Sequence, residues 1–349
     1  MSDVPVPELQ PDRITAYLQA SGHDVTVSNV SAAPIGTGQM AASYRIRLTF
    51  DGDSGGVPSG LVAKVPVGPP ERRQLSANSY RTEVDFYRDL APFLTARTPR
   101  VWAAWRNETG DEFALLLEDL APRIPGDQIA GCSVDEAMLA VRNLAGVHGP
   151  LWGDERLSNH FANGAITVDV VAGIDAVFPA MTDLYMAKSG DQLSDDVRAI
   201  YQQFAPLAGR FVASQPDRPG IVHGDYRLDN LLFSADLSDV AIVDWQTVGL
   251  GLSARDLSFF IATSLEPDVR REAESDLVKE YHRVLSASVG DYSLADCMAE
   301  YAVGMFQMPL VIMFGSAIAE STERGDEMFR VMATRGAAAI KDHGTLELC

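Results

Sequence analysis

The chain has 349 residues, 46% of them hydrophobic, and a formal net charge of −20 at pH 7. This length allows two domains, or one domain with two lobes. The negative charge disfavours non-specific binding to nucleic acid or to anionic membranes, because both depend on basic patches. It places no limit on the binding of a small ligand.

The cellular compartment of the protein is indicated by the absence of a secretory signal, a membrane span and paired cysteines in this sequence. The segment "MSDVPVPELQPDR" has neither the positive end nor the apolar run of a secretory signal, and no uninterrupted apolar stretch approaches the roughly 18 to 20 residues of a membrane span. Cys132, Cys297 and Cys349 lie far apart without a C-x-x-C pair, which indicates neither a disulfide framework nor a zinc site. We therefore expect a cytoplasmic protein without a membrane span.

The first third of the chain has mostly strand-like patterns. A short amphipathic helix is predicted within residues 12–21, and the alternation of residues 25–50 predicts a hairpin with a turn of small residues from Ile35 to Gly38. "LVAKVPV" predicts a further strand, with Lys64 among apolar neighbours. Residues 71–94 have helical spacing, with Glu83 near the start of the apolar stripe.

The pattern changes after two further strand candidates, "RVWAAWRN" and "FALLLEDL". Beyond "APRIPG" it is mainly helical, interrupted by "IVHGDYRLDNLLF" and "VAIVDWQ". We find no internal repeat and no low-complexity tract. A strand-rich front of roughly 117 residues before a helix-rich remainder predicts two unlike lobes, joined near Glu118 to Ala121.

The segment "HGDYRLDN" contains Asp225 and Asn230 in the Asp-x4-Asn spacing of the protein-kinase catalytic loop. In that loop the aspartate accepts the proton of the substrate hydroxyl, and the asparagine holds a magnesium ion. The apolar strand "VAIV" ends at Asp244, where a carboxylate can hold the metal that bridges the phosphates. The turn "SADLSD" puts the two acidic groups at the same end of a hairpin, within reach of one metal-phosphate centre.

Upstream residues fit the same chemistry. Lys64 and Glu83 match the lysine and glutamate that kinases pair to position the α- and β-phosphates. Gly36 and Gly38 lie in the hairpin turn, where the backbone could approach phosphates closely. The turn is a poor match to G-x-G-x-x-G, because Ala41 occupies the place of the third glycine.

Together these motifs resemble the aminoglycoside phosphotransferase and choline kinase superfamily, the protein-kinase-like small-molecule kinases. The finer patterns "LAGVHGPLWG", "HGDYRLDNLLF" and "VDWQTVGLGLSARDLSFFIATS" are closer to its ecdysteroid-kinase-like branch and to related bacterial phosphotransferases. The resemblance extends from about residue 30 to about residue 290. Its motifs are specific in the second lobe, whereas the first lobe resembles the family more by the order of its elements.

The resemblance implies an α+β, protein-kinase-like fold with a β-rich N-lobe, a mainly helical C-lobe and the nucleotide site in the cleft. It implies a nucleotide-binding lobe at 1–117, a hinge at 118–122 and a catalytic and acceptor-binding lobe at 123–349. It also implies ATP and Mg²⁺ as cofactors, and Asp256 as a structural aspartate at a helix N-cap that steadies the catalytic loop. The implied catalytic base is Asp225, and the implied metal ligands are Asn230 and Asp244. The residues implied to bind the nucleotide are Lys64 with its partner Glu83, the glycines Gly36 and Gly38, and Glu118 and Leu120 of the hinge that meets adenine.

The acceptor is expected to be a small-molecule hydroxyl, since no A-P-E segment follows Asp244 and only eleven residues separate it from Asp256. The Met- and Phe-rich residues 301–319 would suit a lipophilic alcohol, sterol-like or hydroxyacyl, although a buried core helix, broken or kinked at Pro309, is the favoured interpretation. Two other functions stay open: an aminoglycoside or macrolide antibiotic kinase, and a non-catalytic nucleotide-binding pseudokinase. Three further points also stay open: whether ATP or GTP is the donor, what the oligomeric state is, and whether Arg227 contacts phosphate or the acceptor.

Overall fold

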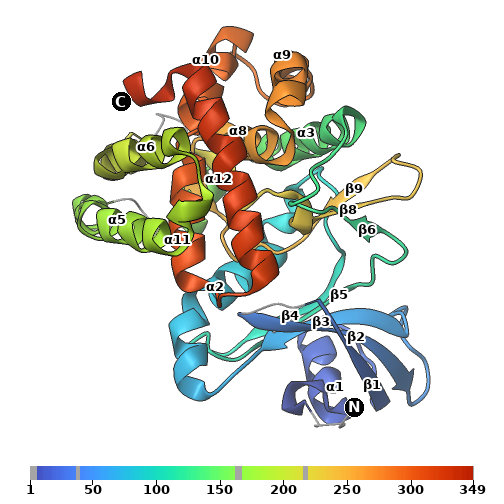
Figure 1. Ribbon diagram of the computed structural model, residues 1–349. Coiled ribbons are helices and arrows are strands. Elements are labelled where there is room, and N and C mark those ends of the chain that lie inside the picture. The colour runs from blue at the N-terminus through green and yellow to red at the C-terminus, as the bar shows by residue number, and fades with distance from the viewer. Residues whose placement is uncertain (1–5, 37–39, 162–166, 215–218, 349) are drawn as a thin grey trace. The chain divides into compact units, whose positions relative to one another are not determined.

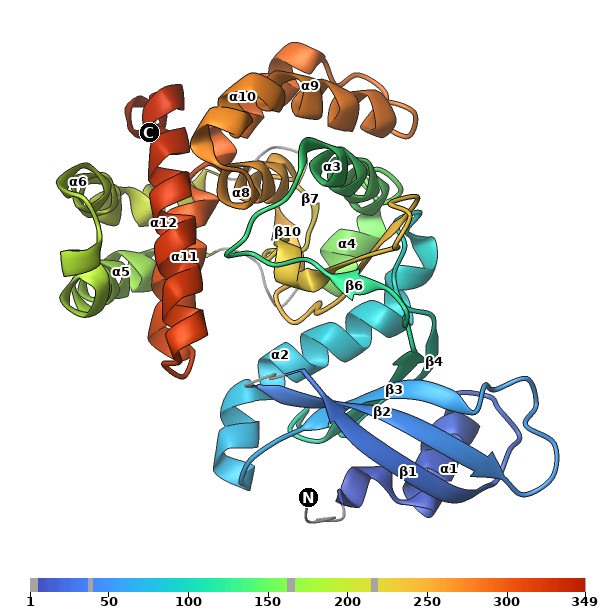
Figure 2. The same cartoon turned by 45° about the vertical axis from the view of Figure 1, so that its right-hand side comes forward.

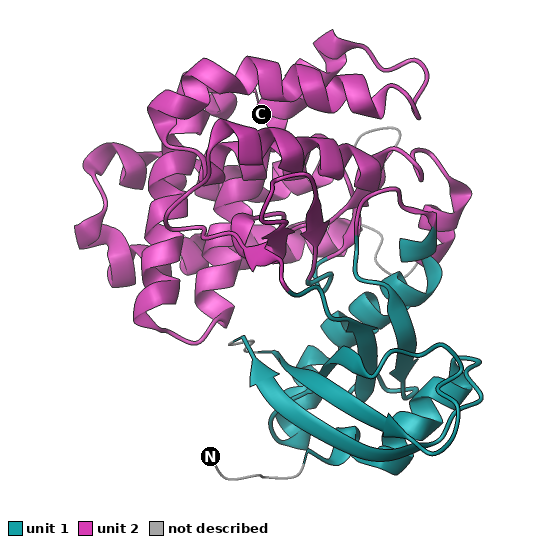
Figure 3. Cartoon of the chain, turned by 90° about the vertical axis from the view of Figure 1, so that its right-hand side faces the viewer, with its two compact units in different colours: residues 1–92, 98–121, 244–247 teal, residues 93–97, 122–243, 248–349 magenta. Residues whose placement is uncertain are grey.

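The computed structural model describes residues 6–36, 40–161, 167–214 and 219–348. The chain divides into two compact units, coloured separately in Figure 3. Unit 1 consists of residues 1–92, 98–121 and 244–247, and unit 2 of residues 93–97, 122–243 and 248–349. The first unit contains a large β-sheet and the second is mainly helical, which confirms the predicted α+β class. The predicted lobe boundaries remain predictions.

Unit 1 is built on a five-stranded antiparallel sheet with the order β1-β2-β3-β5-β4 (Figure 1). The alternation of apolar and polar residues in the sequence matches this half-buried sheet. The elements of unit 1 are η1 (Pro7–Leu9), α1 (Pro11–Ala20), β1 (Val27–Ile35), β2 (Ala41–Phe50), β3 (Gly60–Pro66), α2 (Pro70–Asp89), β4 (Val101–Arg106) and β5 (Phe113–Glu118).

The two faces of this sheet pack against different helices (Figure 2). Ala114 and Leu116 of β5 belong to one buried core with Ile14 of α1. Phe113, on the opposite face of β5, packs its ring against Tyr80 of α2 with the centroids 4.6 Å apart. Because successive side chains of a strand point to opposite faces, α1 and α2 cover different sides of the sheet.

Unit 2 contains two small antiparallel sheets, ordered β6-β8-β9 and β10-β7. Strands β7 and β8 lie on either side of the predicted catalytic loop in the chain, so each end of that loop is anchored in a sheet. The strands of unit 2 are β6 (Ile124–Pro125), β7 (Gly220–Val222), β8 (Leu231–Phe233), β9 (Val240–Ile242) and β10 (Gly249–Gly251).

Helix α8 (Ala254–Ser264) lies in the core of unit 2, where every residue of it except Arg255 is buried. It contacts α3, α9, α10, α11 and α12. The described helices around it are α3 (Val134–His148), α4 (Glu155–His160), α5 (Val168–Ser189), α6 (Asp195–Phe204), α7 (Ala208–Ala213), α9 (Pro267–Leu285), α10 (Leu294–Gly304), α11 (Gln307–Ile318) and α12 (Glu323–His343), and the short 3-10 turns are η2 (Ala91–Phe93), η4 (Gly190–Gln192), η5 (Ala205–Leu207), η6 (Leu228–Asn230) and η7 (Thr345–Glu347).

The Met- and Phe-rich segment is a broken core element, as favoured, but the break lies elsewhere. Helix α10 ends at Gly304 and α11 begins at Gln307, so the chain turns at Met305 and Phe306. Pro309 is the third residue of α11, where the missing N–H of proline leaves no helical hydrogen bond unmade. The expectation of a break at Pro309 was therefore wrong.

Two helical stretches are long and apolar enough to cross a membrane, Val168–Gln192 and Leu294–Ile318. The second is 56% buried within unit 2, as a core helix would be, whereas the first is 17% buried. Length and composition are weak evidence by themselves, because core helices of soluble proteins meet the same two criteria. Neither stretch establishes a membrane span.

Candidate active site

The predicted catalytic loop, residues 223–230, ends in the 3-10 turn η6. This turn brings Asn230 back onto Asp225, so that Nδ2 of Asn230 donates to the Asp225 carbonyl oxygen at 2.9 Å and to its Oδ2 at 3.0 Å. The two residues that the sequence spacing singled out are therefore in direct contact. Their catalytic and metal-binding roles remain predictions.

Arg227 lies against the same carboxylate. Its Nε is 3.0 Å from Oδ2 and 3.1 Å from Oδ1 of Asp225, and its Nη1 donates to Asp229 at 2.5 Å. Burial by itself would lower the pKa of Arg227, but the carboxylates of Asp225 and Asp229 raise it, so the guanidinium stays charged. Arg227 thus neutralises the group that is predicted to accept the substrate proton.

Asp256 holds the start of the loop from the core. Its Oδ2 accepts from the His223 amide at 2.5 Å and its Oδ1 from the Gly224 amide at 3.0 Å. Gly224 adopts a φ of +83°, a conformation that glycine reaches without strain. Asp256 is the third residue of α8 and Ser253 is the N-cap, so the expected N-cap position of Asp256 was wrong.

A buried histidine extends this network. His148 lies with Nδ1 2.6 Å from the Tyr281 hydroxyl and Nε2 3.4 Å from Oδ2 of Asp256. Burial would raise the pKa of Asp256, but the hydrogen bond and charge of His148 and the charge of His223 lower it. This polar contact connects α3 and α9 to the aspartate that holds the start of the catalytic loop.

Gln128 supports the second half of the loop and was not singled out in the sequence. Its side-chain Oε1 accepts from the backbone N–H of Leu228 at 2.8 Å, and its backbone N–H donates to Oδ1 of Asp229 at 3.0 Å. Its Nε2 donates to the Thr263 carbonyl oxygen at 2.8 Å, and Arg335 donates to the Gln128 carbonyl oxygen at 2.9 Å. Gln128, which is fully buried, thus joins α8 and α12 to the catalytic loop.

Replacing Gln128 by alanine should destabilise the protein by about 1–3 kcal/mol, because the buried Leu228 amide loses its acceptor. Turnover should fall while the affinity for ATP stays unchanged. Urea unfolding and steady-state kinetics on one preparation would measure both effects. Gln202, exposed on α6, offers a matched control as Gln202→Ala. Wild-type stability and turnover in the Gln128 variant would contradict the supporting role.

In unit 1 the structure brings together Lys64, Glu83 and Asp244. Ala63 and Val65 of β3 belong to the core beneath α1, so the intervening Lys64 points to the opposite face of the sheet. There its Nζ lies 2.8 Å from Oε1 of Glu83 and 2.9 Å from Oδ1 of Asp244. The predicted lysine and glutamate pair is therefore formed, and the predicted metal ligand Asp244 joins it.

The charges of this cluster are coupled. Burial alone would lower the pKa of Lys64, but the carboxylates of Asp244 and Glu83 raise it above its usual value. Burial raises the pKa of Glu83, although Lys64 opposes the shift. The Glu83 side chain is 1% exposed, whereas that of Asp244 is 43% exposed. Asp244 is therefore the carboxylate of this cluster that solvent, or a ligand from solvent, can reach.

The backbone at Asp244 is held in an unusual conformation. Its φ is +65°, which is uncommon for a residue other than glycine and is better tolerated by aspartate than by most residues. The Trp245 amide donates to Oε1 of Glu83 at 3.3 Å, and its ring stacks on Phe86 of α2 with the centroids 3.9 Å apart. These two contacts hold Trp245, the residue after Asp244, against α2.

The predicted glycine turn lies partly within the described residues. Gly36 follows β1 with a φ of +70°, so its backbone conformation favours glycine. Gly38 lies outside the described residues. At the far side of the turn, the Tyr80 hydroxyl of α2 donates to the Met40 carbonyl oxygen. The role of this turn in phosphate binding stays a prediction.

The predicted hinge residues lie at the end of the sheet of unit 1. Glu118 is the last residue of β5; its amide donates to the Arg100 carbonyl oxygen at 2.8 Å and its Oε2 accepts from the Arg100 amide at 3.0 Å. Leu120 is buried. Asp119 accepts from Nε of Arg45 at 2.6 Å, which ties the segment to β2. Adenine binding by this backbone stays a prediction.

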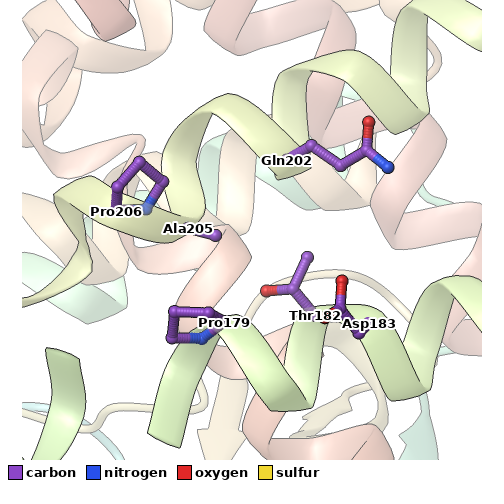
Figure 4. Close-up of a pocket in the computed structure, with 6 residues that line it drawn as sticks. All are labelled: Pro179, Thr182, Asp183, Gln202, Ala205 and Pro206. Carbon is purple, nitrogen blue, oxygen red and sulfur yellow. The ribbon is translucent and has the colours of Figure 1, made fainter. Parts of the chain in front are cut away.

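A pocket of about 360 Å³ opens between α5 and the end of α6 with η5 in unit 2. Figure 4 shows the residues that line it, among which Thr182, Asp183 and Gln202 have polar side chains. None of the predicted site residues lines this pocket. Its lining residues are Pro179, Thr182, Asp183, Gln202, Ala205 and Pro206.

Solved structures with the same fold include kinases of several small molecules. A Ralstonia eutropha JMP134 protein assigned as an aminoglycoside phosphotransferase is 15% identical, with a TM-score of 0.54 over 95% of this chain and 98% of that one. Choline kinase from Cryptosporidium parvum Iowa II is 10% identical, with a TM-score of 0.54 over 92% of each chain. Wild-type aminoglycoside 2'-phosphotransferase-IIIa, solved with GDP, is 14% identical, with a TM-score of 0.51 over 94% of this chain and 99% of that one.

These identities establish a shared fold. A comparison with curated protein sequences gave no match. The model of the ecdysteroid kinase-like family matches residues 36–293, which include both the Lys64 cluster and the catalytic loop. The match covers most of the chain, and the chain therefore belongs to the ecdysteroid kinase-like family, within the protein-kinase-like kinases of small molecules.

Proposed function

We propose that this kinase transfers the γ-phosphoryl group of ATP to a hydroxyl of a small molecule, with Mg²⁺ as cofactor, in the cytoplasm where ATP is supplied. The observation that carries the proposal is the Lys64–Glu83–Asp244 cluster. Burying a lysine and a glutamate is costly, and ion pairs of this kind are rarely needed for stability. The free-energy cost of this cluster is explained if Lys64 positions the triphosphate and the exposed carboxylate of Asp244 coordinates the metal ion.

In the proposed reaction Asp225 orients the acceptor hydroxyl and takes its proton. The hydroxyl oxygen forms a bond to the γ-phosphorus, the bond from that phosphorus to the bridging oxygen of ADP breaks, and the proton passes to the Asp225 carboxylate. The rigid loop supports this role, since Asp256 fixes the two amides before Asp225 and Asn230 contacts its carboxylate. Positioning of this kind supplies most of the catalysis in phosphoryl transfer.

The donor set suits magnesium. Mg²⁺ prefers oxygen ligands and is usually held by one or two protein groups together with phosphates and water. The half-exposed Asp244 carboxylate and the Asn230 amide are groups of this kind. Magnesium bound there would neutralise charge on the β- and γ-phosphates.

Replacing Lys64 by methionine should lower kcat/KM for ATP by roughly 100-fold, because the phosphates lose a charged donor. It also leaves Glu83 buried without its cation, so stability has to be measured beside activity. Lys279, exposed on α9, gives a matched control as Lys279→Met. An unchanged kcat/KM in the folded Lys64 variant would remove the main support for the proposal.

A lipophilic acceptor is the finer part of the proposal. The Met- and Phe-rich segment is mostly buried, so it supports this class less than its composition suggested. Val311, Phe314 and Ile318 nevertheless remain partly or largely exposed along one face of α11. Such an apolar strip would suit an acceptor with a hydrocarbon part.

The two alternatives predict different results. An antibiotic kinase would raise the tolerance of cells that express it to aminoglycosides or macrolides. A pseudokinase would bind ATP without Asp225-dependent turnover. The retained set of Lys64, Asp225 and Asp244, with Asn230 in contact with Asp225, favours an active kinase over a pseudokinase. Slow ATP hydrolysis that requires Asp225 would separate these possibilities.

A further inference from the structure

Arg255 is a half-buried cation with no carboxylate partner among the residues that the structure describes. It is the second residue of α8, where the other residues are buried. Its Nε donates to Oε1 of the buried Gln307 at 2.7 Å, while its Nη groups donate to no atom of the residues that the structure describes. The adjacent Asp256 carboxylate is engaged by the amides of His223 and Gly224.

Two buried arginines of unit 2 are neutralised. Arg270 pairs with Glu274 and Asp342, and Arg335 pairs with Glu266. Burial lowers the pKa of Arg255, and the charge of Asp256 only partly opposes this. A half-buried cation that is only partly compensated costs free energy, so its presence in a chain of net charge −20 favours an anionic ligand that compensates it.

Arg255 is connected to the catalytic loop through one side chain. Nε2 of Gln307 donates to the Gly224 carbonyl oxygen at 2.9 Å, and Gly224 directly precedes Asp225. The guanidinium lies beside Gly251 of β10, where a Cβ would come within 2.8 Å of Nη1 of Arg255. The absence of a side chain at Gly251 therefore gives the guanidinium its place beside this strand.

We propose that Arg255 binds an anionic group, a carboxylate or a phosphate, on the acceptor whose hydroxyl Asp225 activates. The inference rests on the proposed kinase function and names the acceptor class. The planar guanidinium with free Nη groups can hold either anion in two parallel hydrogen bonds. An acceptor bound in this way carries its acid group at Arg255 and its hydroxyl at Asp225, and a cationic acceptor such as an aminoglycoside is disfavoured.

The test uses hydroxycarboxylic acids of increasing chain length, their primary amides, and phosphate monoesters of diols, each with MgATP. Wild type should phosphorylate acids or phosphate monoesters with a lower KM than the matched neutral amides, and the two anionic series show which group is preferred. Arg255→Gln should raise KM for the preferred anion by roughly 10- to 100-fold, as expected for a lost charge-assisted hydrogen bond. KM for the amides should not change.

Two further variants separate recognition from folding. Arg255→Lys keeps the charge but loses the fork, so it should recover part of the preference for anions. Arg210→Gln, at an exposed arginine of α7, should leave every KM unchanged. Circular dichroism and Asp225-dependent ATP hydrolysis would show that each variant is folded and active.

The outcomes distinguish this inference from the function on which it rests. Equal use of acids and amides by wild type, or an equal loss on both in Arg255→Gln, would overturn the role of Arg255 and leave the kinase function intact. Asp225-dependent ATP hydrolysis without phosphorylation of any anionic acceptor would overturn it as well. Absence of Asp225-dependent hydrolysis and transfer together would overturn the proposed function itself.

Discussion

Replacing Asp225 by asparagine should lower phosphoryl transfer, and the slow hydrolysis of MgATP, by roughly 10²- to 10⁴-fold. Asparagine has nearly the same shape and can keep the contact with Asn230, but it cannot take a proton from the acceptor. It also removes the charge that pairs with Arg227 at 3.0 Å. Turnover should therefore fall, while the affinity for ATP, which depends on Lys64, changes little.

The measurement is steady-state turnover beside ATP binding by calorimetry, on the same protein. Asp268 on α9 is highly exposed, and Asp268→Asn offers a matched substitution of the same kind on the surface. It should behave as wild type in both assays. A folded Asp225→Asn enzyme with wild-type turnover would show that another group accepts the proton.

Replacing Asp256 by alanine should produce the largest loss of stability, about 2–6 kcal/mol. Two amides, of His223 and Gly224, would lose the acceptors that they now have at 2.5 and 3.0 Å. Each buried donor left unsatisfied costs roughly 1–3 kcal/mol. Urea unfolding would measure the change, and many preparations of this variant should fail to fold at 37 °C.

The milder Asp256→Asn keeps one acceptor oxygen for the two amides. It should lose less stability than Asp256→Ala but still lower kcat, because the catalytic loop is less well fixed, while KM for ATP stays near the wild-type value. Wild-type stability of Asp256→Ala would contradict the network. Equal kcat in wild type and Asp256→Asn would limit Asp256 to folding alone.

The local motifs could be predicted from the sequence because their chemistry depends on residues close together in the chain. The spacing of Asp225 and Asn230 already implied one loop, and "LVAKVPV" implied a strand that carries Lys64 among apolar neighbours. The structure adds that Asn230 contacts Asp225 and that Lys64 contacts both Glu83 and Asp244.

The groups that support the loop could not be predicted in the same way. Gln128 is 100 residues from Leu228 in the chain, and Tyr281 is 133 residues from His148. Neither belongs to a periodic pattern or to a motif, so their pairing follows only from tertiary packing. The role of Arg255 could not be predicted either. The sequence shows Arg255 next to Asp256, and the structure shows that the Asp256 carboxylate accepts hydrogen bonds from the amides of His223 and Gly224.

The most direct test is to incubate the wild-type protein and Asp225→Asn with MgATP and a mixed panel of acceptors, and to identify phosphorylated products by mass spectrometry. The panel should contain sterols, hydroxy acids, amino alcohols and aminoglycosides. We expect a product whose mass increases by one phosphoryl group with wild type and not with the variant. ATP binding with no Asp225-dependent product from any class would contradict a small-molecule kinase and indicate a nucleotide-binding protein without transfer activity.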